Sequence, residues 1–444
     1  MQAEDSVVRS GTTMKRRVLV GVTAIVATLS MLSVMGLSAA PAGASAPPAL
    51  TAYVSVGSTS SVVPVNLKTK KARTPISVGN GPEAVAITPD GATAYVVNSS
   101  DDDVTPVTTA TNTAHTAISV GTNPTAIAIT PNGATAYVVN QNGNSVTPIA
   151  TATNTAGAAI TVGDTPVGIA ISPDGATAYV ANLNDGTITP ISTVTNAAGT
   201  PINIANAPRA LAIAPDGATI YASTNNHTII PINTATNVPG SAISLSPSSE
   251  LGPLAVTPNG RTLYVEDENG AVVPVDLKTQ TAGTPITGFL FPYGIAVAPN
   301  SRTVYVSNNN GNSVVPINTT SNSVGTPIVV GNNPGGLAIT PDQAPVAHLT
   351  VTPAAHGSPT HFDASGSTVK YGKIAKYVWH FGDGVSATTT IPTVDHTYGS
   401  AGTYHAILIE KSSGGTSTRK VFAGQTMSNN GGSSARVVTP VVVP

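Results

Sequence analysis

A repeat of about 42 residues constrains the fold of this chain more than any other feature. Tyrosines that begin similar segments recur with spacings of 42, 42, 42, 42, 43 and 41 residues. They are Tyr53, Tyr95, Tyr137, Tyr179, Tyr221, Tyr264 and Tyr305. A period in this range is typical of propellers and solenoids. Because each unit contains four short strand-like segments and no helix-length segment, the sequence predicts propeller blades rather than a helical solenoid.

Turn motifs separate the strand-like segments. Pro-Asp-Gly or Pro-Asn-Gly recurs at 89–91, 131–133, 173–175, 215–217 and 258–260. Proline presets φ, Asp or Asn bonds the local backbone, and glycine takes the positive φ that closes a hairpin.

In the segment 126–130, alanines alternate with isoleucines, so both faces of the strand are apolar, as stacked sheets require.

The two ends of the repeat region predict how a ring would close. The chain enters at Tyr53, already on the second strand of a unit, and the missing inner strand appears at the far end as 336–342. We expect the segment before Pro341 to pair with the strand that contains Tyr53, giving a seven-bladed ring of four-stranded blades with a clasp made by both ends. A proline in every third strand, such as Pro148, cannot donate to a ladder and predicts a short or bulged fourth strand.

The segments Tyr-Val-Val-Asn at 95–98 and 137–140, Tyr-Val-Ala-Asn at 179–182 and Tyr-Val-Ser-Asn at 305–308 resemble the YVTN family of β-propeller repeats. The resemblance covers about residues 50 to 343. It implies a seven-bladed propeller of a kind that is often exported and found in surface-layer-like proteins, with ligands that are mostly unassigned. The other units lack the asparagine, so no role shared by the whole ring is implied.

The N-terminal region predicts export. Basic residues at 15–17 precede an apolar run from Val18 to Leu37, and small residues at 42–46 offer Ala-x-Ala cleavage sites. We interpret 1–46 as a secretory signal peptide, with Met14 as the expected start because acidic residues precede it. A twin-arginine signal and an uncleaved anchor are the alternatives. No later apolar stretch is long enough to span a membrane, so we predict a secreted or cell-surface associated protein. The chain has no cysteine, which excludes disulfides and thiolate metal sites. We expect a monomer.

A second module is expected after the propeller of residues 47–343. Trp379 and six of the eight histidines lie there. Motifs that resemble the PKD domain signature occur at 362–367, 377–384, 396–398 and 402–404. Over 344–424 the resemblance implies an immunoglobulin-like β-sandwich with Trp379 in its core, of a kind that serves as a spacer or as an adhesion or polysaccharide-contact module. The tail 425–444 lacks periodicity and is expected to be disordered.

The mouth of the central channel is the default ligand site of a propeller. Repeat alignment places one residue of each inner strand there: Glu83, Thr125, Val167, Arg209, Gly252, Tyr293 and Gly335. We predict that Glu83, Thr125, Arg209 and Tyr293 bind the ligand, because they are the polar, charged and aromatic members of the set. Random drift on solvent-facing loops is the alternative explanation.

The sequence offers no recognisable catalytic constellation, so we predict no catalytic residue, no cofactor and no metal. His115 and His227 lie away from the channel mouth, and the histidines of the second module scatter over both faces of its strands. Acidic segments at 101–103 and 266–270 could supply oxygen ligands to calcium, but they lack EF-hand spacing and are read as solvated loops. A net charge of -2 argues against a nucleic-acid partner.

Three functions follow from this reading. The leading hypothesis is an exported non-catalytic binding, adhesion or scaffold protein whose two modules contact cell-wall or extracellular polysaccharide, or a protein. The rival is an enzyme of lactonase or lyase type that uses the channel mouth, suggested only by the number of blades. The third is an architectural component of a surface layer.

Overall fold

The computed structural model describes residues 50–444 except 205, 247–249, 342–344, 370–373, 413–421, 425–426 and 430–434. The predicted signal peptide lies outside these residues. The described chain is almost entirely strand and turn, with two short 3-10 helices at Gly57–Thr59 and Asn309–Gly311. This confirms the all-β fold class. None of the described helices is long and apolar enough to cross a membrane.

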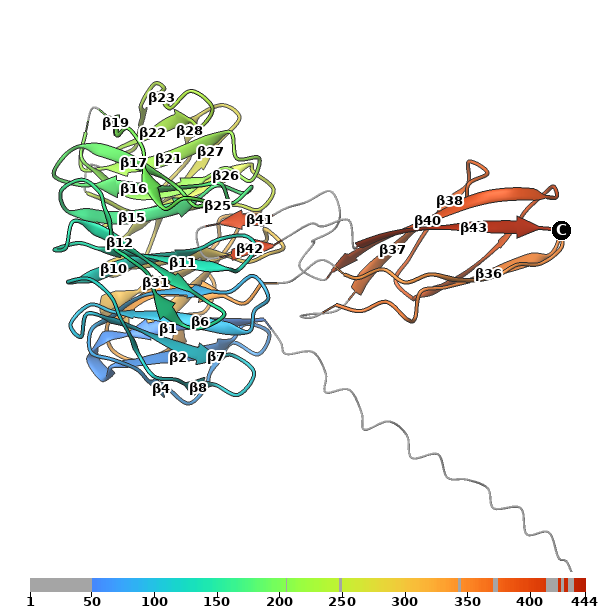
Figure 1. The fold of residues 1–444 in the computed structure, drawn as a ribbon, viewed down its shortest axis with the longest axis horizontal. Coiled ribbons are helices and arrows are strands. Elements are labelled where there is room, and N and C mark those ends of the chain that lie inside the picture. The colour runs from blue at the N-terminus through green and yellow to red at the C-terminus, as the bar shows by residue number, and fades with distance from the viewer. Residues whose placement is uncertain are drawn as a thin grey trace, which may run out of the picture. The chain divides into compact units, whose positions relative to one another are not determined.

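Residues 51–339 form seven antiparallel sheets within the described chain, and one pattern recurs in them (Figure 1). The inner strands are β5 (Pro82–Ile87), β10 (Pro124–Ile129), β15 (Pro166–Ile171), β20 (Pro208–Ile213), β25 (Leu251–Val256), β30 (Pro292–Val297) and β34 (Pro334–Ile339). The second strands, which carry the repeated tyrosines, are β1 (Thr51–Val56), β6 (Thr93–Asn98), β11 (Thr135–Asn140), β16 (Thr177–Asn182), β21 (Thr219–Thr224), β26 (Thr262–Asp267) and β31 (Thr303–Asn308). The third strands are β2 (Ser61–Asn66), β7 (Asp103–Thr108), β12 (Ser145–Ala150), β17 (Thr187–Ser192), β22 (Thr228–Asn233), β27 (Ala271–Asp276) and β32 (Ser313–Asn318).

In six of these seven sheets of the described chain, the outermost strand is split into two pieces of two residues each, and in the seventh only one such piece is present. The pieces are β3 (Lys71–Ala72) and β4 (Ile76–Ser77), β8 (Thr113–Ala114) and β9 (Ile118–Ser119), β13 (Thr155–Ala156) and β14 (Ile160–Thr161), β18 (Ala197–Ala198) and β19 (Ile202–Asn203), β23 (Val238–Pro239) and β24 (Ile243–Ser244), β28 (Thr281–Ala282) and β29 (Ile286–Thr287), and the single piece β33 (Ile328–Val329). In one sheet, β13 and β14 pair with opposite ends of β12 and leave Pro148 between them. The Pro148 carbonyl still accepts from Gly157 N–H, at 2.7 Å. The expected effect of the proline is confirmed: without an N–H it cannot donate to a continuous fourth strand.

The predicted pairing between the two ends of the repeat region is confirmed. Strand β1 pairs antiparallel with β34, with Val54 opposite Leu337. Thr340 N–H extends the ladder by donating to Thr51 O at 2.8 Å. The inner strands contact one another in the succession β5, β10, β15, β20, β25, β30, β34 and back to β5. We call residues 50–341 the ring.

The repeated tyrosine and asparagine are structural. Buried Tyr137 donates from Oη to Asn196 Oδ1 of the next sheet at 2.6 Å. Buried Asn140 donates from Nδ2 to Thr147 Oγ1 at 2.9 Å and accepts at Oδ1 from Gly121 N–H at 3.1 Å. A Cβ at Gly121 would lie 2.6 Å from the Asn140 amide, so this position requires glycine. In this sheet the motif therefore bonds the second strand to the third strand and to the next sheet, and the same tyrosine-to-asparagine bond is formed by Tyr53, Tyr95 and Tyr264.

The C-terminal module, residues 345–444, contains two sheets around one core. One sheet has the order β35 (Thr350–Thr352), β36 (Pro359–Asp363), β39 (Thr393–Thr397), and the other β38 (Ser386–Thr389), β37 (Ile374–His380), β40 (Gly402–Ser412), β43 (Arg436–Val443). A separate hairpin joins β41 (Phe422–Gly424) and β42 (Met427–Asn429). Trp379 is 1% exposed, packs against Phe362 and Tyr377, and donates from Nε1 to Thr389 Oγ1 at 3.0 Å. Its expected place in the core is confirmed.

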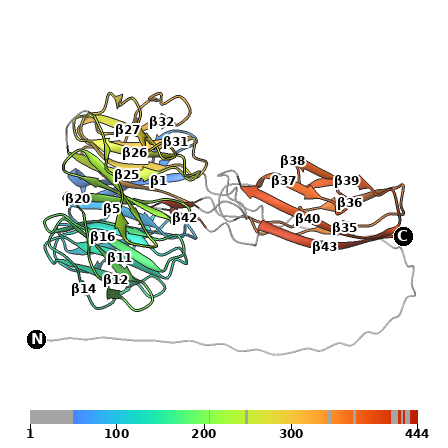
Figure 2. The same cartoon turned by 90° about the horizontal axis from the view of Figure 1, so that it is seen from above.

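The expectation of a disordered tail over 425–444 is wrong for its last part. Strand β43 pairs with β40 from Arg436 opposite Ile409 to Val443 opposite Gly402, and Figure 2 shows the two strands side by side. Val441 and Val443 are buried in the core. The segment is rich in β-branched residues, which favour a half-buried pleated surface. The module therefore extends beyond residue 424.

Candidate ligand-binding site

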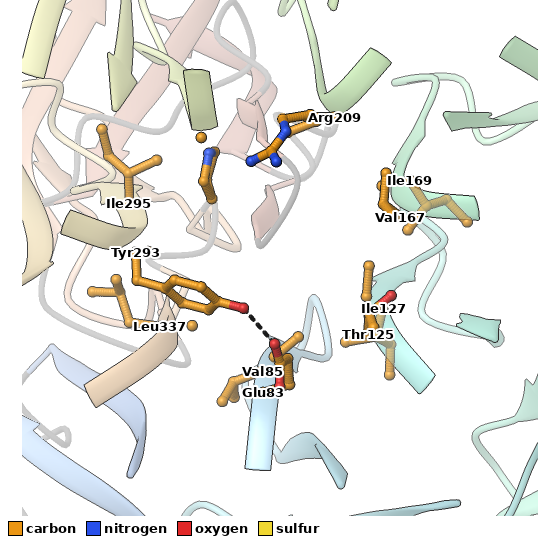
Figure 3. Close-up of a pocket in the computed structure, with 18 of the residues that line it drawn as sticks. Glu83, Val85, Thr125, Ile127, Val167, Ile169, Arg209, Tyr293, Ile295 and Leu337 are labelled. Carbon is orange, nitrogen blue, oxygen red and sulfur yellow. Dashed lines mark hydrogen bonds between the residues drawn. The ribbon is translucent and has the colours of Figure 1, made fainter. Parts of the chain in front are cut away.

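A cavity of about 380 Å³ lies where the inner strands of the ring begin (Figure 3). It is lined by Glu83, Thr125, Val167, Arg209, Gly252 and Tyr293, the residues that repeat alignment placed at the channel mouth. Figure 3 shows Glu83, Thr125, Arg209 and Tyr293 around one common space. Gly335 is not among the lining residues, and its neighbour Gly336 is. The structure therefore brings together the residues predicted to bind a ligand.

Local strand geometry explains why these positions meet. In β10, Pro124 lies opposite Asn140 and Ala126 opposite Val139, so the register shifts at Thr125. The same shift occurs in β5 at Glu83 and in β20 at Arg209. A bulge leaves one residue outside the regular pairing and redirects its side chain. The repeated bulge thus presents one side chain per inner strand to the cavity.

Glu83 and Tyr293 form a hydrogen-bonded pair across the cavity. The Tyr293 hydroxyl donates to Glu83 Oε1, although 210 residues separate them in sequence. Ser99 Oγ donates to the other Glu83 oxygen at 3.4 Å. Burial, followed by the charge of Glu83, raises the pKa of Tyr293 above its ordinary value. Tyr293 therefore stays a neutral phenol that can donate a hydrogen bond.

Arg209 is held by three acceptors. Its Nε donates to Asn225 Oδ1 at 2.7 Å, its Nη1 to Glu268 Oε1 at 2.7 Å, and its Nη2 is paired with Glu250. Two carboxylates thus offset the single guanidinium, and Glu83 adds a further negative charge to the cavity wall. Glu268 belongs to the acidic segment 266–270 that the sequence led us to interpret as a solvated loop, and Glu250 was not predicted to reach the site. Their role as partners of Arg209 follows only from the structure.

Phe291 places a second aromatic ring beside Tyr293. The ring centroids are 6.4 Å apart with an interplanar angle of 25°. Phe291 has φ 56°, in the left-handed region, where the equivalent residues of other sheets include Gly81 and Asn123. The Phe291 carbonyl accepts from Asn309 N–H at 3.1 Å, which fixes the segment. The two rings, 38% and 36% exposed, form an aromatic edge of the cavity.

Glu266 is a buried carboxyl behind the cavity wall. It lies on β26, is 1% exposed, and neither side-chain oxygen has a hydrogen-bond partner within the described chain. Burial raises the pKa of Glu266 well above its ordinary value, which favours the neutral acid over the carboxylate. The interpretation of 266–270 as a solvated loop is therefore wrong for Glu266 and Asp267, because both are buried strand residues.

Other charged and imidazole groups do not meet at this cavity. Asp101 accepts from Asn80 N–H at 2.7 Å, and Asp102 from Asn123 N–H at 2.7 Å. Among the described residues, no group of three His, Cys, Asp or Glu could hold a metal ion. His115 and His227 are not among the lining residues.

The C-terminal module holds its own histidine contacts. His396 Nε2 lies 2.7 Å from Asp383 Oδ2, and its ring stacks on Phe381 with centroids 4.0 Å apart. His361 Nδ1 lies 2.6 Å from Asp395 Oδ1. These contacts tie strands of the module together.

Comparison with known proteins identifies the second module. Residues 342–426 match the PKD domain. By sequence, no curated protein matches the chain. The PKD match agrees with the motifs around Trp379.

Solved structures resemble the ring. A hydrazine synthase structure from Kuenenia stuttgartiensis is 24% identical, with a TM-score of 0.56, over 65% of this chain and 95% of that one. A protein of unknown function from Desulfotomaculum acetoxidans is 17% identical, with a TM-score of 0.59, over 65% and 98%. The periplasmic gluconolactonase of Pseudomonas aeruginosa is 17% identical, with a TM-score of 0.55, over 66% and 99%. At these identities the likeness shows a propeller-like fold, and it says nothing about activity.

Proposed function

We propose that the chain is an exported, non-catalytic binding protein: a seven-bladed propeller holds a small sugar-like ligand in the ring cavity, and an immunoglobulin-like PKD sandwich follows it. The observation that carries this proposal is the hydrogen-bonded pair of Glu83 and Tyr293 at the cavity wall. Export is supported by the basic and apolar N-terminal segment and by the PKD match, since such domains are typical of extracellular proteins.

The chemistry of the wall favours a polyhydroxylated ligand. A sugar offers apolar C–H faces to aromatic rings and hydroxyl groups to carboxylate and amide oxygens. Phe291 and Tyr293 supply the rings, while Glu83, Glu268 and Gln141 supply acceptors. A volume of about 380 Å³ suits a small ligand or the end of a chain.

Binding to cell-wall polysaccharides and defined oligosaccharides tests the proposal. We expect Tyr293→Ala and Glu83→Gln each to weaken binding by about tenfold or more, because each removes a contact to a charged or aromatic group. His115→Ala is the matched control, since His115 lies outside the cavity. If the purified protein binds no glycan, or if both cavity variants bind as well as the wild type, the proposal is wrong.

A lactone-hydrolysing enzyme is the second candidate. It is favoured by Glu83 and Arg209, which line one cavity, where a carboxylate could activate water and a guanidinium could stabilise an oxyanion. The gluconolactonase resemblance concerns the fold. An activity screen on lactones and cyclic esters, repeated with Glu83→Ala and Arg209→Ala, decides between the two functions. Equal background rates in all three proteins would eliminate the enzyme.

A further inference from the structure

We propose that the ring cavity recognises a protonated primary amine on its ligand, and that Glu266 is the carboxylate that receives it. The ligand class is then an amino sugar. This inference rests on the proposed function of the same cavity and specifies the chemical group that the cavity selects.

The first support is the position of Glu266. The Cβ that Gly252 lacks would lie 3.5 Å from Glu266 Oε2, and Gly252 lines the cavity. At the equivalent positions of other inner strands, side chains such as Glu83 and Tyr293 form the wall. The missing side chain at Gly252 therefore leaves the Glu266 carboxyl behind the cavity wall, where its oxygens are buried and become reachable for a ligand group only when the Gly252 segment shifts.

The second support is that the fold does not require a carboxyl group there. The equivalent residues in the other sheets are small: Ser55, Val97, Val139, Ala181, Ser223 and Ser307. Ser223 satisfies its hydroxyl by donating to Gly252 O at 3.0 Å. Glu266 instead has two oxygens without a protein partner within the described residues. An unsatisfied buried carboxyl destabilises the fold, so a ligand group that pairs with it explains the residue better than packing does.

The third support is the charge around Glu266. Glu250 and Glu268 pair with the single guanidinium of Arg209, and Glu83 adds a third carboxylate on the same cavity wall, which leaves an excess of two negative charges. Arg209 already bonds two of these carboxylates. An ammonium group is therefore favoured over an anion. The rings of Phe291 and Tyr293 at the cavity edge also attract a cation.

Binding at Glu266 has a proton signature. Burial raises the pKa of Glu266 well above its ordinary value and so favours the protonated carboxyl, whereas an ammonium ion pairs with the carboxylate, so binding favours release of a proton. The neighbouring groups that share this electrostatic environment are Tyr293 on β30, Glu83 on β5, Arg209 on β20, and Glu250 and Glu268 beside β25 and β26. Burial, followed by the charge of Glu83, raises the pKa of the Tyr293 phenol, which therefore stays a neutral hydrogen-bond donor beside these carboxyl groups.

Titration calorimetry with three probes tests the proposal. The probes are a glucosamine oligosaccharide, its N-acetylated equivalent and propylamine, each measured at neutral pH in two buffers of different ionisation enthalpy. We expect the wild type to bind the amino sugar about tenfold or more tightly than the acetylated one and to release a proton. Glu266→Gln should lose both the preference and the proton release. Glu266→Ser, which creates the residue found in other sheets, repeats the test if the glutamine variant folds poorly.

Ser307→Ala is the matched control, because Ser307 is the equivalent buried residue of the next sheet and its hydroxyl also lacks a partner within the described chain. It should keep the preference. Equal affinity for the charged and acetylated sugars, with Tyr293-dependent binding, would overturn the amine proposal and leave the sugar-binding function standing. If propylamine binds but neither oligosaccharide binds, the sugar-binding function is wrong, whereas recognition of an amine by this cavity still stands. A variant Glu266→Gln that retains the preference would also overturn the amine proposal.

Discussion

At the scale of single residues, Phe291 marks where the regular repeat is interrupted for the cavity. A left-handed conformation costs an ordinary residue about 1 kcal/mol or more, and other sheets place Gly81, Asn123, Thr165 or Asn333 there. Such strain is found where the surrounding structure imposes it, often at ligand sites. We expect Phe291→Asn to increase the free energy of unfolding of the ring by about 1 kcal/mol and to weaken glycan binding. Chemical denaturation followed by far-UV circular dichroism measures the first effect.

The reverse substitution at a matched position provides the control. Asn123→Phe should destabilise the ring by at least a similar amount, because Asn123 has φ 51°, its side chain donates to Gln141, and the residue two positions on is Thr125 rather than a tyrosine. If Phe291→Asn instead lowers the stability, the ring gains more from packing Phe291 than it loses in backbone strain, and the argument from strain is wrong.

Glu410 should make the stability of the C-terminal module depend on pH. The residue is fully buried, and burial raises its pKa from 4.5 to about 7. Between these values the folded module binds a proton that the unfolded chain does not, so stability falls as pH rises through this window and is constant above it. The loss is at most about 3 kcal/mol.

Fluorescence of Trp379, the only tryptophan in the chain, reports this module during urea denaturation at about pH 5 and pH 8. We expect a lower midpoint at the higher pH in the wild type and a much smaller difference in Glu410→Gln. A variant with the same pH dependence as the wild type would assign the effect to other groups.

The residues at the channel mouth could be predicted from the repeat. Site residues at positions where one unit departs from the repeat could not be predicted. Glu83, Thr125, Arg209 and Tyr293 could be found because each occupies the same position in its unit. Glu266 could not be found, because a run of acidic residues is the usual composition of a solvated loop. Only the pairing of Glu266 with Val272 places it inside a buried strand.

At the scale of elements, prolines and alternation decide where strands stop. Pro148 and its equivalents predicted a weak fourth strand, and the structure splits that strand in two. The C-terminal strand β43 was missed because Pro440 and the Gly- and Ser-rich segment before it are typical of disordered tails. Pro440 is tolerated because β43 pairs with only one neighbour and is an edge strand.

Two adjacent valines of β43 test whether this strand is part of the module. Val441 is 1% exposed and Val442 is 63% exposed, since alternate residues face opposite sides of a strand. We expect Val441→Ala to destabilise the module by about 1 to 3 kcal/mol and Val442→Ala to change its stability by about 0.5 kcal/mol or less. Denaturation followed by Trp379 fluorescence measures both. Equal, negligible effects would mean that the segment does not pack in solution.

At the scale of the whole molecule, the repeated antiparallel sheets and the pairing of the chain ends could be predicted, because recognising recurring tyrosines and inner strands requires no side-chain detail. The cavity chemistry required the bulges, the left-handed Phe291 and the loops around Arg209, none of which has a sequence signature of its own. The ring and the C-terminal module have separate cores in the described chain, because the core around Trp379 contains only residues of its own module. Each should therefore have its own unfolding transition.

The pairing of β1 with β34 determines whether the ring unfolds as one unit. Val54 pairs with Leu337 across this join, whereas Val96 pairs with Val85 within one continuous sheet, and both valines are fully buried. If the join closes the ring, Val54→Ala and Val96→Ala should lower the same transition by a similar amount, about 1 to 3 kcal/mol, and leave the Trp379 transition unchanged. If the join were only a local contact between chain ends, Val54→Ala would increase hydrogen exchange in β1 and β34 while the ring midpoint stayed at the wild-type value. Far-UV circular dichroism with hydrogen exchange on both variants distinguishes these outcomes, because only a closed ring transmits a defect at the join to every sheet.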